Sequence, residues 1–224
     1  MKIGLFGCGA YGMALSSILI ANDHEVEMWT KFQEEKERLE TTRKNEKLLP
    51  GYTLSDKIKI TTSVKDCIKD KDLLIIAIPA AFIDSLALEM QPYIKDNHIL
   101  IATKGIEQGT GLFINEILEK YLDTKNIAAI SGPTFAVDLI TKMPAGLSVA
   151  SKNDETIELA IKALQNKYIK LRPTHDIIGV ETCGAIKNVI ALSIGTRPDC
   201  LDDDVLDYLE EVNKKTYLWV ELGL

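Results

Sequence analysis

The stretch that decides the fold is KIGLFGCGAYGMALSSILIAN, residues 2–22. An apolar run typical of a strand leads into Gly7, Gly9 and Gly12, and an apolar helical pattern begins at Ala10. In such a strand–loop–helix unit, G-x-G-x-x-G glycines permit a tight turn, close approach of the backbone to a pyrophosphate, and close helix packing. The helix N-terminus adds free N–H groups and a partial positive charge. The stretch therefore predicts a dinucleotide-binding βαβ unit; a plain strand-to-helix turn is the alternative.

Short apolar runs continue to alternate with amphipathic stretches along the chain. The runs EVEMW, LLIIAI, HILIAT, IAAIS and GLSVA predict strands, and residues 10–21, 32–43, 80–90, 112–122 and 154–165 predict helices. Several strands are apolar on consecutive residues, as in strands that are covered on both faces. Strands that alternate with helices imply right-handed βαβ units. We therefore expect an α/β fold with a Rossmann-like, doubly wound, mostly parallel sheet.

The pattern changes near the end of the chain. A long helical pattern covers residues 176–194 and is broken by GTRPD, after which residues 201–212 can form an acidic amphipathic helix. We predict a dinucleotide-binding domain over residues 1–173. Residues 174–224 would be the start of a helical substrate domain, truncated or divergent after residue 195.

Composition excludes several classes of protein. Apolar residues make up 46% of the chain, the net charge is −7 and the pI is about 5.1, so we expect no nucleic-acid partner. The four cysteines and three histidines are scattered, which predicts reduced thiols and no metal site. The longest apolar run, residues 73–83, is too short to span a bilayer, and the first residues lack a secretion signal. We expect a cytoplasmic protein without a membrane segment; pairing into a homodimer is left open.

The end of the second predicted strand bears on the choice of cofactor. An NAD site usually has an acidic residue there to hold the ribose hydroxyls. This chain has MWTK, which places Lys31 at that position. A cation would accept a 2′-phosphate, so we expect NADP to bind at least as well as NAD. A solvated surface lysine is the alternative interpretation.

A second lysine, Lys187, lies in the apolar helical run CGAIKNVIAL, residues 183–192. Its helical neighbours three and four residues away carry no group that pairs with an ammonium. Because burial of an unpaired charge is costly, lysine is rarely buried without a reason. Either its ammonium has a chemical role, or the side chain extends from a buried helix to solvent.

Six stretches together resemble the bacterial-type NAD(P)-dependent glycerol-3-phosphate dehydrogenase family. They are GCGAYGMAL, NEKLLPG, IAIPA, ATKGIE, SGPTFA and IGVETCGAIKNVIAL, in that order across residues 1–195. Related dehydrogenases of 3-hydroxyacids or 6-phosphogluconate share the glycine loop, but are not expected to carry the later motifs together. The resemblance implies reduction of dihydroxyacetone phosphate to sn-glycerol 3-phosphate with NAD or NADP, for the supply of glycerophospholipid precursors.

The resemblance also implies roles for particular residues. Cofactor contacts would come from Ala10 through its backbone N–H, from the Tyr11 ring, and from Ala136. Lys104, Gly132 and Thr134 would contact the substrate, and Lys104 also the cofactor. Lys187 would bind substrate and be the general acid/base that donates a proton to the ketone oxygen, with a pKa lowered by desolvation. Taken from the residues alone, Lys104 is also compatible with a surface lysine and Thr134 with a helix N-cap.

The likeness ends after Gly195. The family continues with a helical domain that supplies further contacts to the substrate. Two other functions therefore stay open: a catalytically incomplete NAD(P)-binding protein of the same family, and a different phospho-substrate reductase with a minimal second domain.

Overall fold

The computed structural model describes residues 1–196, and the side chains of residues 1–187. The chain divides into two compact units, Met1–Gly184 and Ala185–Leu224, with the division inside one helix, α8 (Ile177–Thr196). The acidic helix predicted over residues 201–212 lies outside the described residues, as does nearly all of the divergent tail. The predicted domain boundary after residue 173 stays a prediction; a strand, β8, ends one residue later, at Thr174.

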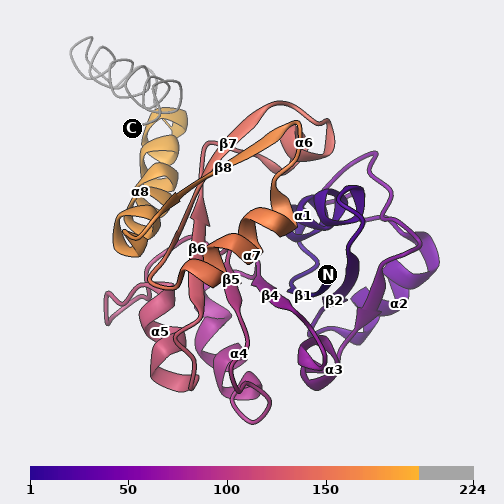
Figure 1. Ribbon diagram of the computed structural model, residues 1–224. Coiled ribbons are helices and arrows are strands. Elements are labelled where there is room, and N and C mark those ends of the chain that lie inside the picture. The colour runs from indigo at the N-terminus through magenta and orange to yellow at the C-terminus, as the bar shows by residue number, and fades with distance from the viewer. Residues whose placement is uncertain (197–224) are drawn as a thin grey trace. The chain divides into compact units, whose positions relative to one another are not determined.

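One eight-stranded sheet organises the unit Met1–Gly184 (Figure 1). Its strands are β1 (Lys2–Phe6), β2 (Glu25–Trp29), β3 (Lys59–Thr61), β4 (Leu73–Ile76), β5 (Ile99–Ile101), β6 (Ile127–Ser131), β7 (Ala145–Ser151) and β8 (Ile169–Thr174). Their order is β3-β2-β1-β4-β5-β6-β7-β8. All neighbouring pairs are parallel except β6 and β7, which are antiparallel. The predicted mostly parallel, doubly wound α/β sheet is confirmed.

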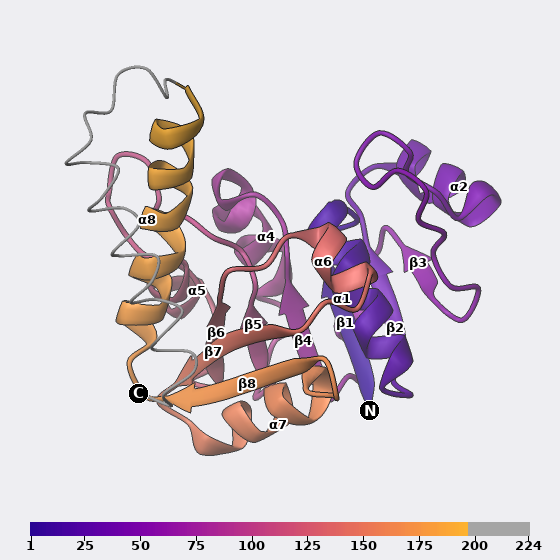
Figure 2. The ribbon, with the colours of Figure 1, turned by 90° about the horizontal axis from the view of Figure 1, so that it is seen from above.

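Helices cover both faces of this sheet (Figure 2). One face carries α1 (Ala10–Ala21), α6 (Ala136–Ile140) and α7 (Asp154–Leu164); the other carries α3 (Val64–Ile68), α4 (Ile83–Met90) and α5 (Ile114–Tyr121). Helix α2 (Gln33–Thr42) follows β2, and the short 3-10 helix η1 (Ala80–Phe82) precedes α4. Most helices lie within a few residues of the predicted ranges.

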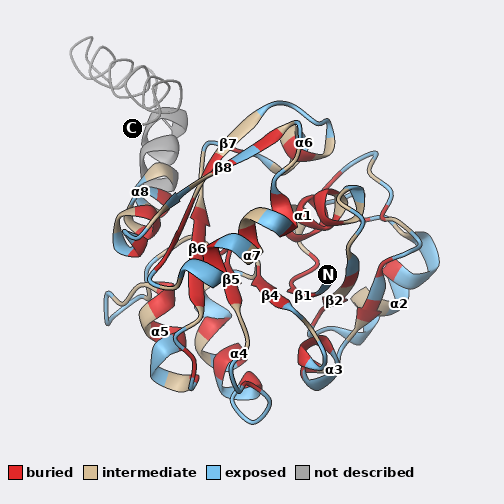
Figure 3. Ribbon diagram, viewed as in Figure 1, coloured by how far each residue is buried: buried red, intermediate tan, exposed pale blue. Residues whose placement is uncertain are grey.

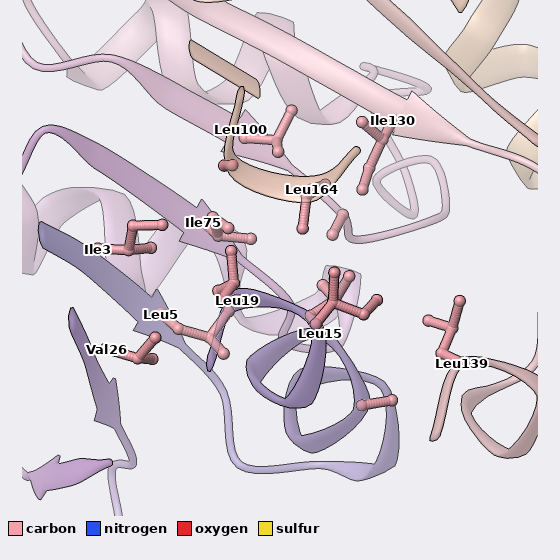
Figure 4. Packing of buried hydrophobic residues seen from close by; sticks show 14 of the residues in the cluster. Ile3, Leu5, Leu15, Leu19, Val26, Ile75, Leu100, Ile130, Leu139 and Leu164 are labelled. Carbon is pink, nitrogen blue, oxygen red and sulfur yellow. The ribbon is translucent and has the colours of Figure 1, made fainter. Parts of the chain in front are cut away.

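Consecutive strand residues enter two different cores. Ile3 and Leu5 pack on the α1 side of the sheet, whereas Phe6 packs on the α4 side. Figure 4 shows Leu19 of α1 close to Leu5 and Ile75 of the sheet, and Figure 3 shows the central strands β4, β5 and β6 largely buried. Because side chains alternate across a strand, a strand with two covered faces must be apolar at every position, as the sequence indicated.

Several short elements are not visible in the sequence pattern. β3 has three residues and α3 has five, too few to show a period. β8 contains Arg172 and Pro173 and is exposed at several positions, so it lacks the apolar run of a central strand. It pairs through its backbone with β7 at the edge of the sheet, a place where proline is tolerated. Across the described residues, no helix is both long and apolar enough to cross a membrane.

Candidate functional site

The strand order reverses direction between β1 and β4, which are adjacent in the sheet. In open parallel sheets, ligands bind outside the carboxyl ends of the strands at such a switch point. The glycine loop follows β1 directly and leads into α1. The geometry therefore places the sequence-predicted dinucleotide loop at the position where this sheet topology binds ligands.

The three glycines of the loop have different structural roles. Gly7 has a φ of +123°, and a Cβ there would lie 2.4 Å from the carbonyl oxygen of Ala77. A Cβ on Gly12 would lie 2.2 Å from the carbonyl oxygen of Gly7. Both residues must be glycine because backbone atoms occupy the space. A Cβ on Gly9 would meet nothing within 4 Å, so at Gly9 the protein itself does not require the missing side chain.

Gly9 is also the N-cap of α1, and no side chain caps that N-terminus within the described structure. The first turn, which contains Ala10, Tyr11 and Gly12, carries no acidic residue. The open space beside Gly9 and the uncapped N–H groups form a cradle that a side chain would fill and that suits an anionic diphosphate. The residues present fit the pyrophosphate of a dinucleotide.

The end of β2 holds more charge than the sequence pattern suggested. Lys31 lies 3.6 Å from Glu89 of α4, measured from Nζ to Oε1. Thr30, which is buried, donates a hydrogen bond from Oγ1 to Oε2 of Glu35 at 2.5 Å. Glu35 is not evident from the sequence pattern because it lies six positions after the last strand residue, Trp29, and the first turn of α2 brings it back beside Thr30. Contact between Lys31 and a cofactor stays a prediction.

Three predicted site residues from distant segments meet beside the glycine loop. The hydroxyl oxygens of Tyr11 and Thr134 lie 3.2 Å apart and share a hydrogen bond. The ammonium of Lys104 lies 5.7 Å from the centre of the Tyr11 ring, within the range of a cation–π contact. Burial raises the pKa of the Tyr11 hydroxyl, and the Thr134 hydrogen bond opposes this rise. The cluster therefore presents a neutral phenol and a hydroxyl beside a cation.

The loop after β6 is shaped by close packing. A Cβ on Gly132 would lie 2.6 Å from a side-chain carbon of Leu147 and 2.7 Å from the carbonyl oxygen of Gly146. The N-cap of α6 is Phe135, whose N–H donates to Asp138 at 2.9 Å. The interpretation of Thr134 as an N-cap is therefore wrong, because its hydroxyl faces Tyr11. Ala136 is the first residue of α6 and packs against the α1-side core.

A buried carboxyl that sequence reasoning missed shares a small cavity with Lys104. Glu181, Lys104 and Ser131 help to line a small cavity of about 10 Å³. One Glu181 oxygen accepts the N–H of Asn115 at 3.2 Å. The other carboxyl oxygen is buried and has no hydrogen-bond partner among the described residues. Burial raises the pKa of Glu181 from 4.5 to about 7, although the N–H groups of Asn115 and Ile114 oppose the shift.

Lys187 lies in the second unit, three residues after Gly184 in α8, and its side chain is half-buried. Gly184 belongs to the first unit, where an added Cβ would lie 3.0 Å from the Ser131 hydroxyl and 3.7 Å from a Lys104 side-chain carbon. The glycine thus allows α8 to approach β6 closely. The catalytic role of Lys187 stays a prediction.

Residues 2–157 match the family model described as the NAD-dependent glycerol-3-phosphate dehydrogenase N-terminus. The chain belongs to the NAD-dependent glycerol-3-phosphate dehydrogenase family. The resemblance drawn from the six sequence motifs is confirmed.

Individual relatives agree with this family assignment. The chain is 32% identical over 195 residues to a glycerol-3-phosphate dehydrogenase [NAD(P)+] of Agathobacter rectalis, covering 87% of this chain and 58% of the relative. Its identity to the Leptospira biflexa protein of the same name is 34% over 199 residues, covering 87% and 60%. The chain thus spans about three fifths of the length of these curated relatives.

A solved structure shares the fold. The crystal structure of a glycerol-3-phosphate dehydrogenase from Coxiella burnetii superimposes with a TM-score of 0.86 at 23% identity. The match covers 99% of this chain and 69% of that one.

Proposed function

We propose that this protein binds NAD(H) or NADP(H) and reduces dihydroxyacetone phosphate to sn-glycerol 3-phosphate. The observation that carries the proposal is the meeting of Tyr11, Lys104 and Thr134 beside the open cradle at Gly9. The family match supports the identity of cofactor and substrate, because the related proteins carry that activity in their names.

The cofactor would lie along the carboxyl ends of β2, β1 and β4. Gly7 and Gly12 shape the loop, and the N–H groups at Ala10 and Tyr11 would bind the pyrophosphate at the N-terminus of α1. Two exposed aromatic side chains, Phe32 after β2 and Phe82 after β4, follow the strands on either side of β1. They would flank the adenine. Ala136, at the start of α6, and the Tyr11 ring would contact the cofactor farther along.

The substrate would lie against the ends of β5 and β6. Lys104 supplies a cation that suits a phosphorylated substrate, and it would contact the cofactor as well. The Thr134 hydroxyl and the backbone at Gly132 would donate hydrogen bonds to substrate oxygens. The bound cofactor supplies the hydride in this family of reactions.

Lys187 would donate the proton that completes the new hydroxyl group. The residue lies one helical turn after Gly184, and in a helix residues three apart lie on the same side. In the reduction the Lys187 ammonium would donate to the ketone oxygen of dihydroxyacetone phosphate. In the oxidation the neutral amine would accept the proton of the secondary hydroxyl.

Turnover is tested by following the absorbance of the reduced cofactor after addition of dihydroxyacetone phosphate. Lys187→Ala should lower kcat by ~10²–10⁴ while cofactor affinity stays within about twofold. Lys187→Arg is the matched control for charge, because a guanidinium stays protonated and should be as slow. Either variant at the wild-type rate would exclude Lys187 as the acid.

A second candidate function is a catalytically incomplete NAD(P)-binding protein of the same family. The loss of likeness to the family in the sequence after Gly195 favours it. Cofactor binding without turnover in the assay above would select it. A location in the cytoplasm and pairing into a homodimer remain predictions, which fractionation and light scattering would test.

A further inference from the structure

NAD and NADP differ at the 2′ position of the adenosine ribose, where one has a hydroxyl and the other a phosphate. The residue that reads this position lies near the end of β2 in a sheet of this topology. The last residues there, Trp29 and Thr30, carry no charge. The charged candidates are Lys31, Glu35 and Arg38.

The ammonium of Lys31 is directed to α4. It lies 3.6 Å from Oε1 of Glu89, and the two side chains are 58% and 47% exposed. A solvent-exposed pair of this kind is weak, so it does not hold Lys31 firmly. The pairing nevertheless supplies a carboxylate that would compete with a phosphate for this lysine.

Glu35 is more firmly held. Its side chain is only 20% exposed, and its Oε2 accepts the hydroxyl proton of buried Thr30 at 2.5 Å. The same Thr30 oxygen accepts the N–H of Phe32 at 3.3 Å, which fixes the hydroxyl direction. Hydrogen bonds to a carboxylate are roughly twice as strong as those between neutral groups. The carboxylate is therefore positioned at the end of β2 in place of the missing strand-end acid.

Glu35 also acts on the glycine loop. Burial raises the pKa of the Cys8 thiol, the Glu35 carboxylate raises it further, and the Arg38 guanidinium lowers it. Cys8 lies between Gly7 and Gly9. Both charges of α2 are thus close enough to the loop to influence a side chain in it, and the carboxylate has the larger effect.

We propose that Glu35 accepts hydrogen bonds from the adenosine ribose hydroxyls and makes this chain select NAD(H) over NADP(H). The inference rests on the proposed cofactor site. A carboxylate accepts two hydroxyl protons well but repels a 2′-phosphate, which carries up to two negative charges. Arg38 lies 3.4 Å from Oε1 of Glu35 and is 50% exposed, so it offsets this repulsion only in part.

The experiment measures dissociation constants of NADH and NADPH by fluorescence titration of the full chain. In the wild type, NADH should bind more tightly. In Glu35→Gln the ratio of the two constants should move toward NADPH by about tenfold or more, because a charged acceptor is lost and a repulsive charge removed. Thr30→Val, which fills the same buried space but cannot hold the carboxylate, should move the ratio in the same direction by less.

Two further variants separate the rival explanations. Glu34→Gln makes the same charge change at the exposed neighbouring position and should leave the ratio within about twofold. Lys31→Ala tests the cation predicted from sequence. A ratio that responds no more to Glu35→Gln than to Glu34→Gln, or a larger response to Lys31→Ala, would overturn the assignment.

The outcomes also distinguish a failure of this inference from a failure of the proposed function. A wild-type chain that binds neither NADH nor NADPH contradicts the cofactor site itself. A chain that binds both, with a ratio that Glu35→Gln does not change, contradicts only the role of Glu35.

Discussion

The two ends of the candidate site are built by different means. At the nucleotide end, the backbone of the glycine loop forms the cradle, and the charges around it are paired near the surface, as in Lys31–Glu89. At the substrate end, polar side chains are buried: Thr134 is 5% exposed and Glu181 is 7% exposed. Backbone geometry is insensitive to pH and intolerant of added atoms. Buried side chains tolerate isosteric change but respond to their state of charge. The two ends should therefore fail in different ways.

The largest effect is expected within the glycine loop. Gly12→Ala places a Cβ 2.2 Å from the backbone oxygen of Gly7, which cannot move without displacing β1 from α1. We expect a loss of about 3 kcal/mol or more in the free energy of unfolding, measured by urea denaturation.

Gly9→Ala is the matched control for that change. Its Cβ enters open space and its φ of −70° suits alanine, so stability should change by only about 1 kcal/mol. Gly9→Val should instead weaken cofactor binding by tenfold or more, because the side chain fills the cradle. Equal losses of stability in Gly9→Ala and Gly12→Ala would contradict the proposal that Gly12 is required for backbone packing and Gly9 only for cofactor binding.

The substrate end should respond to pH through Glu181. Its pKa in the folded chain, about 7, lies above the ordinary 4.5, so folding favours the protonated form. This contribution to stability is complete below pH 4.5 and is lost as pH rises through 7, by about 3 kcal/mol in total. Glu181→Gln should flatten that part of the profile of unfolding free energy against pH.

The control for Glu181 is Glu158→Gln, the same change at an exposed position of α7. Its profile of unfolding free energy against pH should match that of the wild type. A Glu181→Gln profile that still falls between pH 5 and 8 would mean that groups other than Glu181 cause the dependence.

A smaller effect is expected for the hydrogen bond that joins α1 to the loop after β6. Tyr11→Phe and Thr134→Val each remove one hydroxyl of the pair and should cost about 1 kcal/mol in stability. The double variant should cost less than the sum of the two, since the second change removes a partner already lost. Additive losses would show that the two hydroxyls are not coupled.

The smallest effect is expected for the surface pair at the nucleotide end. Lys31→Ala and Glu89→Ala should each change stability by less than about 1 kcal/mol, and their coupling should decrease in high salt. Thermal unfolding of the wild type, the two single variants and the double variant, at low and high salt, measures the stability changes and the coupling. A coupling as large as that of Tyr11 and Thr134 would remove the contrast between the two ends.

The sequence predicted most reliably where the signal is local. The glycine spacing after a strand fixes a turn and a helix start within six residues, and consecutive apolar residues in β1 and β4 indicated two covered faces. Motif order across the chain also indicated the family. The strand β3, the helix α3 and the edge strand β8 were missed because they are too short or too exposed to show a period.

What only the tertiary structure decided is which distant groups meet. Tyr11 and Thr134 are 123 positions apart, and their hydroxyls share a hydrogen bond because α1 and the loop after β6 lie beside one another. Glu35 lies six positions after β2, so its contact with Thr30 is not evident from the sequence. Buried Glu181 accepts a hydrogen bond from Asn115 of α5, which lies 66 positions away. Local steric constraints depend on consecutive residues and can be inferred from the sequence. The burial and charge state of a side chain depend on all the segments that surround it. The sequence therefore determined the sheet, the cradle and the family, and the packing of the chain determined the charge and hydrogen bonding of the site.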